Sequence, residues 1–276
     1  MTLNYDLHSH STASDGTLTP TELILRAVDK KVDVLAITDH DCINGLAEAQ
    51  KAAYQNQIKL INGAELSSLW NGLTLHITAL DIDPQNITLQ KLLNDTLEFR
   101  KWRGEEIGKK LERAGVTDAG AKTLELVKDG AVTRGHYAQL LLNLGLVKNF
   151  QAAFDKYLGK GKRAYVAGQW ADINTVVSTI HAAGGLACVA HPKRYKTTNS
   201  KLNKLFADFK ECGGDAIEVI NANSTPNDIK YLAQCAENHQ LMASRGSDFH
   251  TPCKWIELGR LQALPESCQP VWDKFK

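Results

Sequence analysis

The chain has 276 residues, which is enough for one large domain or for a domain that carries an insertion. Hydrophobic residues make up 43% of the chain and charged residues 23%, proportions that argue against disordered, collagen-like and coiled-coil proteins. The apolar runs are far shorter than the roughly 18 residues of a membrane span, and the N-terminus lacks a secretory signal, so we expect a cytoplasmic protein with no membrane partner.

The first 66 residues alternate between strand and helix patterns, which is typical of a parallel α/β architecture. The clearest helix follows Thr19, which is a predicted N-cap, with Pro20 at the first helical position and Glu22 completing a capping box. A second helix is predicted over 45–55. Strands are predicted over 4–8, 32–38, 58–66 and 73–80.

From about residue 89 the apolar residues recur with helical spacing, and Gly115 is a plausible end of the first long helix. Helices are predicted over 89–115, 119–128, 134–144 and 150–158, and no strand pattern returns until Gly185. A helix over 172–183 and strands over 186–190, 216–220 and 241–244 complete the pattern. We therefore predict an α/β body at 1–97 and 164–276, interrupted by a helical insertion at 98–163.

The insertion differs from the body in charge. Residues 98–163 contain 14 Lys and Arg residues against 8 Asp and Glu residues, a net charge of +6, while the whole chain carries only +1. A basic segment on an acidic body is what binding of a polyanionic substrate would select. A solvated helical surface with pairs such as Glu106 near Lys110 explains the same charge equally well.

Histidines and carboxylates gather after the predicted strands. His8 and His10 end the first strand as an i, i+2 pair, which directs both imidazoles to the same side. The other members lie in or after later strands: Asp15, His40, Glu65, His76, His191, Asp248 and His250. Most of these positions are carboxyl ends of strands, where barrel enzymes build their sites, so we expect the side chains to converge.

Any one of these histidines taken alone is more often a core residue than a ligand. Six imidazoles and three carboxylates at one rim would repel or remain poorly solvated without a cation between them. Imidazole and carboxylate without thiolate favour Mn²⁺, Fe²⁺ or Zn²⁺. Nine ligands exceed the needs of one ion and suit two or three divalent ions that share a bridging carboxylate.

Five sequence blocks carry a family resemblance: Asp6–Gly16, Ile37–Asp41, Gly63–Ser67, Ala190–Pro192 and Gly246–His250. In order and spacing they resemble the signature blocks of the PHP (polymerase and histidinol phosphatase) metallophosphoesterases. The resemblance implies a distorted seven-stranded (β/α) barrel with a trinuclear metal site. It assigns His8, His10, Glu65 and Asp248 to one ion, Glu65, His76 and His191 to a second, and Asp15, His40 and His250 to a third.

Further blocks resemble the TrpH/YciV group within this family: Val132–His136, Lys160–Val166, His191–Tyr195 and Gly259–Leu261. This group includes a nucleoside 3′,5′-bisphosphate phosphatase and a 5′→3′ exoribonuclease, so the resemblance implies short RNA 5′ ends or nucleoside 3′,5′-bisphosphates as substrates. The chain departs from the group at Gly135, where proline is expected, and this change would loosen how His136 is held.

The expected chemistry is hydrolysis of a phosphoester. Bound metals lower the pKa of water and neutralise phosphate oxygens, so water is the expected nucleophile. We expect Asp15, His191 and His250 to be catalytic, together with Arg134 and His136. The guanidinium groups of Arg134 and Arg194 suit fork-like contacts with phosphate, and His136 would donate to a phosphate oxygen or to the leaving group. Surface ion pairs are the alternative for both arginines.

Two other functions fit parts of the pattern. A histidinol-phosphate phosphatase shares the metal chemistry but has no need of a basic helical insertion. A non-catalytic PHP module for metal binding or protein interaction would tolerate the loss of ligands, whereas all nine positions are present here. No obligate protein partner is indicated.

Several weaker candidates are expected to be structural. The six cysteines show no CxxC pair and are predicted to be reduced thiols. Side chains alternate between the two faces of a strand, so the side chain of Cys188 should point away from the metals. His181 and His239 lie near helix C-termini, where a partly charged imidazole is favourable. Two roles are open for the large aromatic residues: stacking on a nucleobase, or packing in the core or at its rim. These residues are Trp70, Trp102, Trp170 and Tyr195.

Overall fold

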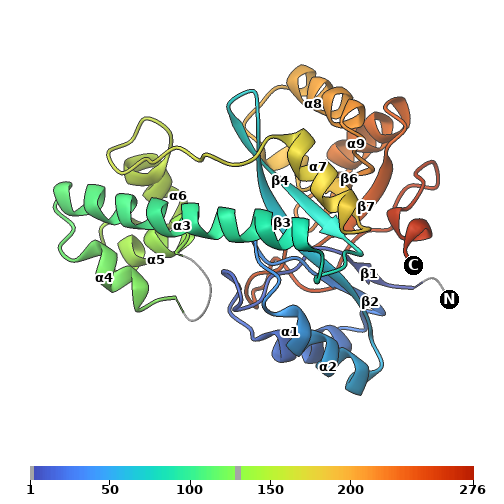
Figure 1. Ribbon diagram of the computed structural model, residues 1–276, viewed down its shortest axis with the longest axis horizontal. Helices are drawn as coiled ribbons and strands as arrows, with labels where there is room; N and C mark the ends of the chain where they lie inside the picture. Colours follow the sequence, from blue (N-terminus) through green and yellow to red (C-terminus); the bar gives the residue numbers. More distant parts are fainter. Residues whose placement is uncertain (1–2, 128–131) are drawn as a thin grey trace. The chain divides into compact units, whose positions relative to one another are not determined.

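A computed structural model describes residues 3–127 and 132–276 of the chain (Figure 1). The chain divides into two compact units. Residues 1–92 and 170–276 form the barrel unit, and residues 93–169 form the helical unit. Among the helices that the structure describes, none has the length and apolar character of a membrane-crossing segment.

The barrel unit is built on one seven-stranded sheet whose strands lie in chain order. Its strands are β1 (Tyr5–Asp6), β2 (Val34–Ile37), β3 (Lys59–Trp70), β4 (Leu73–Leu80), β5 (Leu186–Val189), β6 (Ala216–Asn221) and β7 (Met242–Gly246). Each of the seven lies within or overlaps a strand predicted from the sequence. Short apolar runs bounded by turn residues are typical of strands buried on both faces, which explains the agreement.

The first and last strands approach each other and nearly close the sheet into a barrel. The backbone amide of Leu7 donates to Arg245 (3.0 Å), and that of His10 donates to Phe249 (2.8 Å). The predicted strand 4–8 is therefore too long: β1 ends at Asp6, and the following residues bond to the segment after β7 instead of extending a regular ladder. The predicted class, a distorted seven-stranded α/β barrel with an inserted helical part, is confirmed.

One strand runs against the others. β4 is antiparallel to both β3 and β5, while the remaining neighbouring pairs are parallel. Asn71 and Gly72 form the tight connection between β3 and β4, and both have positive φ, as two-residue hairpin turns require. Within this hairpin Ser67 pairs with His76. The reversed strand brings His76 next to the carboxyl-end residues of β3.

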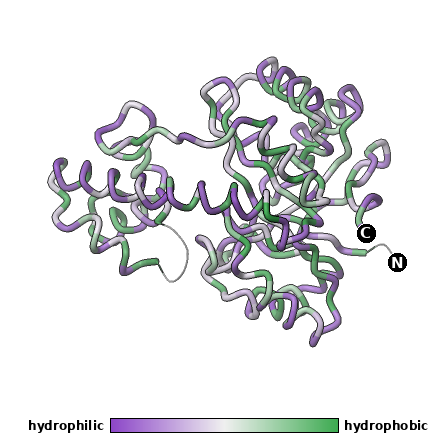
Figure 2. Tube along the Cα trace, in the orientation of Figure 1, coloured by the Kyte–Doolittle hydropathy of each residue, from purple (hydrophilic) through white to green (hydrophobic). Residues whose placement is uncertain are grey.

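Five helices cover the sheet: α1 (Pro20–Asp29), α2 (Leu46–Asn56), α7 (Ile173–Ala182), α8 (Asn199–Glu211) and α9 (Pro226–Asn238). The capping box at the start of α1 is present as predicted, with Thr19 accepting from the amide of Glu22 and the side chain of Glu22 accepting from the amide of Thr19. Hydrophobic and hydrophilic stretches alternate along α8 and α9 (Figure 2). The inward-facing residues of α8 are fully buried, although the sequence reading assigned no helix there.

The helical unit contains most of α3 (Ile87–Arg113), then α4 (Ala119–Leu124), α5 (Arg134–Asn143) and α6 (Phe150–Ala153). α6 continues as a π-helical turn over Phe154–Leu158, so the predicted helix 150–158 is correct in extent but changes type. The predicted helix 119–128 is shorter than expected, since α4 ends at Leu124, and Lys128 lies outside the described residues.

This unit has its own apolar core, which includes Leu111, Tyr137, Leu141 and Leu158. Close packing between helices depends on Gly108 of α3: a Cβ atom there would lie 2.8 Å from Oη of Tyr137 and 3.0 Å from Cα of Gly120. Three short 3₁₀ or π elements complete the fold, namely the π-helical turn, Pro192–Arg194 and Val271–Lys274.

Candidate metal centre

The nine predicted ligands come from six segments of the barrel unit. Glu65 lies in β3 and His76 in β4, whereas His8 and His10 follow β1 and His40 follows β2. The remaining four lie in connecting segments: Asp15 before α1, His191 after β5, and Asp248 and His250 after β7. The structure brings eight of the nine into three overlapping groups, and within each group the candidate ligand atoms lie within 4.8 Å of one another. The ninth, His191, contacts Glu65, which belongs to two of these groups.

Glu65 stands at the centre of this arrangement, and its side chain is fully buried. Its Oε1 lies 3.0 Å from Nδ1 of His76 and 2.9 Å from Nε2 of His191. Its Oε2 lies 2.9 Å from Nδ1 of His40 and 3.4 Å from Nε2 of His10. A single carboxylate that faces imidazoles on both oxygens has the position of a bridging ligand between ions.

Two aspartates flank Glu65. Oδ1 of Asp248 lies 3.3 Å from Nε2 of His8 and 3.2 Å from Nε2 of His10. On the other side, Oδ1 of Asp15 lies 3.3 Å from Nε2 of His250. The three carboxylates therefore divide the imidazoles into neighbouring groups, and each group contains both nitrogen and oxygen donors.

Several nitrogen and oxygen atoms of the cluster have no hydrogen-bond partner in the part of the chain that the structure describes, which is the arrangement expected of metal ligands. Among the described residues, neither ring nitrogen of His8 or His10 makes a hydrogen bond, although both side chains are at least 99% buried. Oε2 of Glu65 is also buried without a hydrogen bond. Buried polar atoms are costly without partners, so this set of imidazole and carboxylate donors fits divalent cations.

The same crowding governs the ionisation of the side chains. Burial alone disfavours charge on Glu65, but the surrounding imidazoles, led by His76, outweigh burial and hold its pKa well below the usual range. Burial lowers the pKa of His10 to about 3, assisted by repulsion from His250. Burial also opposes the charging of His250, yet Asp248 and Asp15 raise its pKa to about 10.

Backbone strain accompanies the ligands. His191 has φ +31° and Asp248 has φ +55°, so both non-glycine residues occupy the left-handed region. Such conformations cost on the order of 1–3 kcal/mol each and tend to occur at functional sites. Both residues lie just after strands β5 and β7, where the turn directs each side chain toward the cluster.

Known proteins match this chain along its whole length. A 5′-3′ exoribonuclease of Haemophilus influenzae is 49% identical over 277 residues and covers 100% of both chains. The 3′,5′-nucleoside bisphosphate phosphatase of Chromobacterium violaceum is 41% identical over 275 residues, with 99% of this chain and 96% of that protein covered. A solved structure of an amidohydrolase from the same organism, with bound sulfate and no metal, has 40% identity and a TM-score of 0.93 over 98% of this chain and 95% of that one.

The PHP domain family matches residues 6–167, which is more than half of the chain. This protein is a member of the PHP domain family. The resemblance of its sequence blocks is thereby confirmed. The matched range includes His8, His10, Asp15, His40, Glu65 and His76, and the structure adds His191, Asp248 and His250 from the carboxyl-terminal part of the barrel unit.

The sequence analysis missed a fourth acidic residue, which lies behind the cluster of this PHP domain. Glu218 of β6 is 2% exposed, and its Oε1 lies 3.3 Å from Nδ1 of His8. Its Oε2 accepts a hydrogen bond from the backbone amide of His191 at 2.5 Å. A carboxylate inside the apolar run Ala216–Asn221 was the available signal, because charged residues are rarely buried without a partner.

Two further aspartates shape the loops that carry the ligands. Asp39 accepts hydrogen bonds from the amide and hydroxyl of Ser11 and from the hydroxyl of Ser14, which fixes the segment between His10 and Asp15. Asp6 accepts from the amides of Ser247 and Gly259, and burial raises its pKa. Both carboxylates lie inside the PHP sequence blocks, although the sequence reading gave them no role.

Arg194 lies beside the cluster. Its Nη1 forms an ion pair with Asp248, and its Nη2 donates to Oδ1 of Asn221 at 2.8 Å. Tyr195 accepts a hydrogen bond from the backbone amide of His76 at 2.9 Å, and its ring packs edge-on against His191. Tyr195 therefore supports two histidines of the cluster.

Arg134 and His136 belong to the helical unit, at the start of α5. Nδ1 of His136 accepts from the amide of Thr133 at 3.1 Å, and the amide of His136 donates to the hydroxyl of Thr133. This capping box holds His136 even though Gly135 replaces the expected proline. The guanidinium carbon of Arg134 lies 5.8 Å from the ring centroid of Phe154, which is a cation–π geometry.

The weaker candidates take structural positions. His181 pairs with Asp215 at 2.8 Å, and His239 contacts Asn203 at 2.8 Å at the end of α9. Cys188 lies in an apolar cluster of the barrel core, as its strand parity predicted. Trp70 is buried and donates to Asp208 of α8, so it supports the packing of a helix on the hairpin.

Proposed function

We propose that this PHP domain is a metal-dependent phosphoesterase that removes nucleotides from the 5′ end of 5′-phosphorylated RNA. The observation that carries the proposal is the convergence of nine imidazole and carboxylate side chains, with buried donor atoms that lack hydrogen bonds, in a chain of this family. The 49% identity to a 5′-3′ exoribonuclease over the full length favours RNA as the substrate.

Removal of the 3′-phosphate from nucleoside 3′,5′-bisphosphates is the second candidate. The 41% identity to a 3′,5′-nucleoside bisphosphate phosphatase over nearly the whole chain favours it. Both reactions place a phosphoester of a nucleotide at the metals and leave a nucleoside to be held nearby. The two activities are compatible as one reaction on substrates of different length.

We assign two or three divalent ions to the cluster, with Mn²⁺ favoured and Fe²⁺ or Zn²⁺ as alternatives. Imidazole and carboxylate ligands without thiolate support this assignment, and metal availability decides among ions of such similar preference. His8, His10 and Asp248 would hold one ion and His76 and His191 a second, with Glu65 between them. Asp15, His40 and His250 would hold the third.

When bound, such ions neutralise phosphate oxygens and lower the pKa of water, so that water is the nucleophile. The protein's own contribution is a preformed, mostly buried set of donors that does not need to reorganise. Asp15, His191 and His250 would fix the reacting groups at the rim of the cluster. Arg194 is placed to contact a phosphate oxygen if its guanidinium leaves Asp248, and a planar fork suits that contact.

The helical unit would bind the polyanionic part of the substrate, with Arg134 and His136 as its main contacts. Its charge supports this role. Burial, and to a smaller extent repulsion from Arg134 and Arg100, lowers the pKa of Arg103 to about 9. A concentration of positive charge of this kind is stabilised by phosphates and steers nucleic acid toward the protein.

The decisive experiment compares three substrates with Mn²⁺-loaded protein: a 5′-monophosphorylated RNA oligomer, adenosine 3′,5′-bisphosphate and histidinol phosphate. Stepwise release of mononucleotides from the 5′ end supports the exoribonuclease, and cleavage of the bisphosphate alone supports the second candidate. Preference for histidinol phosphate, or absence of hydrolysis by protein that holds its metals, contradicts both. The cytoplasmic location and the lack of an obligate protein partner remain predictions.

A further inference from the structure

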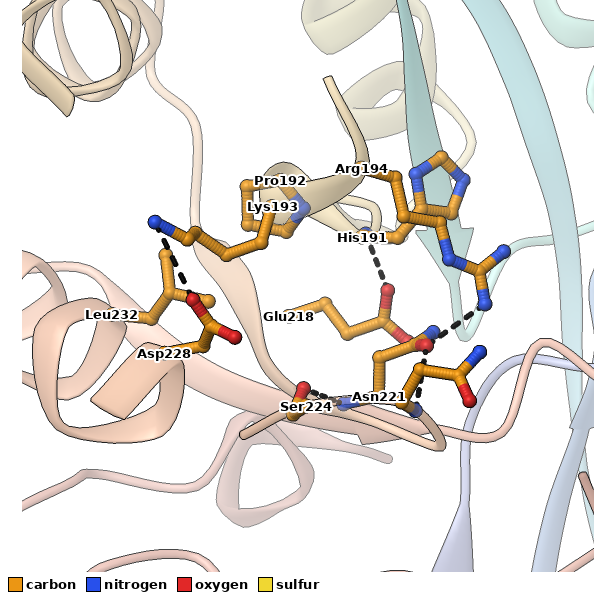
Figure 3. Close-up of a pocket in the computed structure, with 10 residues that line it drawn as sticks. His191, Pro192, Lys193, Arg194, Glu218, Asn221, Ser224, Asp228 and Leu232 are labelled. Atoms are coloured by element: carbon orange, nitrogen blue, oxygen red, sulfur yellow. Dashed lines mark hydrogen bonds and ion pairs between the residues drawn. The ribbon is translucent and has the colours of Figure 1, made fainter. Parts of the chain in front are cut away.

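A cavity of about 250 Å³ opens next to the metal cluster in the barrel unit (Figure 3). We call it the α9 pocket. Its wall is formed by His191 and Arg194 on the side of the cluster, by Glu218 and Asn221 in the middle, and by Asp228 and Leu232 of α9 on the far side (Figure 3). The volume lies just below the roughly 300–1,000 Å³ of pockets for drug-sized ligands, so it suits a single nucleoside.

The charges of the wall are balanced. Lys193 pairs with Asp228 at 3.4 Å, and the charge of Arg194 is directed toward the metal cluster, where it pairs with Asp248 and would meet the reacting phosphate. The carboxylate of Glu218 faces His8. A second phosphate in this pocket would require cations in excess, because an anion that is removed from water needs compensating charge. The balance therefore favours a neutral occupant, and Pro192 and Leu232 supply apolar surface for it.

One polar group in the wall has no partner. Asn221 is only 9% exposed, and its Nδ2 makes no hydrogen bond to any residue that the structure describes. The orientation of this amide is fixed, because the guanidinium of Arg194 only donates and must therefore meet Oδ1, as it does at 2.8 Å. Nδ2 is thus a buried donor that needs an acceptor.

The backbone holds Asn221 in place. Its amide donates to the hydroxyl of Ser224 at 2.8 Å, and its carbonyl accepts from the amide of Ser224 at 3.0 Å. This turn joins β6 to α9 and leaves the carboxamide little freedom. An unpaired donor in a rigid segment is suited to bind a ligand, because the side chain loses little conformational entropy when the ligand binds.

We infer that the α9 pocket binds the nucleobase of the nucleotide whose phosphate lies at the metals, with Nδ2 of Asn221 donating to a ring nitrogen or carbonyl oxygen of the base. The inference rests on the proposed function and names the part of the substrate that this pocket receives. Every common base offers such an acceptor, so one donor gives affinity for a base without selecting among bases.

The test uses Mn²⁺-loaded protein and two substrates, adenosine 3′,5′-bisphosphate and phenyl phosphate, the second of which has no nucleoside. Asn221→Asp keeps the volume and the acceptor for Arg194 and removes the donor, while Asn221→Ala removes both. Asn203→Ala is the matched control, because Asn203 is exposed on α8 and contacts His239. We expect Asn221→Asp to raise KM for the bisphosphate by about tenfold and to leave KM for phenyl phosphate unchanged, whereas Asn221→Ala, which also releases Arg194, should raise KM for both substrates.

Equal changes on both substrates in Asn221→Asp, or no change on either, would overturn the inference. Calorimetric binding of AMP and of inorganic phosphate keeps the test independent of turnover. If the wild-type protein hydrolyses no nucleotide, the proposed function fails, and the pocket is then judged by binding alone. AMP binding that is tighter than phosphate binding and is weakened in Asn221→Asp supports the pocket, whereas AMP that binds no more tightly than phosphate rejects it.

Discussion

The carboxylate of Glu218 lies 3.3 Å from Nδ1 of His8, so the opposite ring nitrogen of His8 faces Glu65 and Asp248. Carboxylates that hold the second nitrogen of a ligating histidine fix the tautomer and the ring orientation, and they raise the basicity of the ligand. Because the other oxygen of Glu218 accepts from the amide of His191, one buried side chain contacts two members of the cluster.

Replacing Glu218 by glutamine should weaken metal binding by roughly 10–100-fold. A carboxylate accepts on both oxygens, whereas a carboxamide has one acceptor and would turn its NH₂ toward His8 or toward the amide of His191. Calorimetric titration with Mn²⁺ measures the effect, and Glu266→Gln on the exposed surface is the control. Wild-type affinity in the Glu218 variant would show that the carboxylate does not orient the ligands.

Replacing Asp15 by asparagine should reduce the rate of hydrolysis by more than roughly 100-fold, while the protein stays folded. Loss of a residue that only supports a metal ligand costs up to about 100-fold, and Asp15 is assigned as a ligand itself. Asp15 faces His250, and together with His40 these residues form one group of donors. The number of bound ions per chain, measured by elemental analysis, should fall. Asp29→Asn, at an exposed position of α1, serves as the control, and unchanged hydrolysis in the Asp15 variant would refute the assigned role.

The convergence of the nine side chains could be predicted from the sequence because most of them follow or lie in a strand with a strong apolar pattern, as His40 does after β2. Glu218 could not, although it stands out as a charge within an apolar strand. Its role depends on the pairing of β6 with β7, where the register shifts between Glu218 and Ile220, and local sequence does not specify such an irregularity.

The α9 pocket was equally beyond sequence reasoning. Asn221 ends β6 and reads as an ordinary turn residue, and its unpaired amide follows from the distant contact with Arg194. Helix α8, in contrast, was predictable, because its buried residues Leu202, Leu205, Phe206 and Phe209 recur at i, i+3, i+4 and i+7, the spacing of an amphipathic helix.

Replacing Gly246 by alanine should destabilise the barrel unit by about 1–3 kcal/mol, as expected for overpacking. A Cβ atom at this position would lie 2.2 Å from Cβ of His8 and 2.8 Å from Oε1 of Glu218. Metal binding should weaken as well, because His8 must move. Gly120→Ala is the control, since a Cβ there meets nothing closer than 3.8 Å. Equal unfolding free energies for the two variants in urea would contradict this account.

Replacing Tyr137 by phenylalanine should cost about 1 kcal/mol at pH 7, because its hydroxyl donates to the carbonyl of Gly104 at 2.7 Å in the core of the helical unit. Burial, with a smaller contribution from Glu112, raises the pKa of Tyr137 to about 12. A pKa raised above the unfolded value of roughly 10 gives stability that is complete below pH 10 and is lost as the pH rises toward 12.

The wild-type protein should therefore lose more unfolding free energy between pH 10 and pH 12 than Tyr137→Phe does. Denaturant titrations at several pH values measure the difference, and the other tyrosines titrate identically in both proteins. Tyr54→Phe, at a side chain that is 88% exposed, should follow the wild-type curve. Parallel curves for the wild-type protein and Tyr137→Phe would show that this hydroxyl does not contribute.

Two variants of His136 separate its role in the cap of α5 from its proposed contact with substrate. Nδ1 accepts from the amide of Thr133, and a glutamine oxygen can serve the same capping box, whereas alanine cannot. His136→Ala should lose about 0.5–2 kcal/mol of unfolding free energy, and His136→Gln should lose little.

Hydrolysis of 5′-phosphorylated RNA should fall by about 100-fold or more in both His136 variants if the imidazole donates a proton to the substrate or to the leaving group. The comparison of stability with kcat/KM is decisive, because a purely structural role predicts that activity follows stability. A glutamine variant with wild-type kcat/KM would restrict His136 to the cap and would leave Arg134 as the contact in this segment.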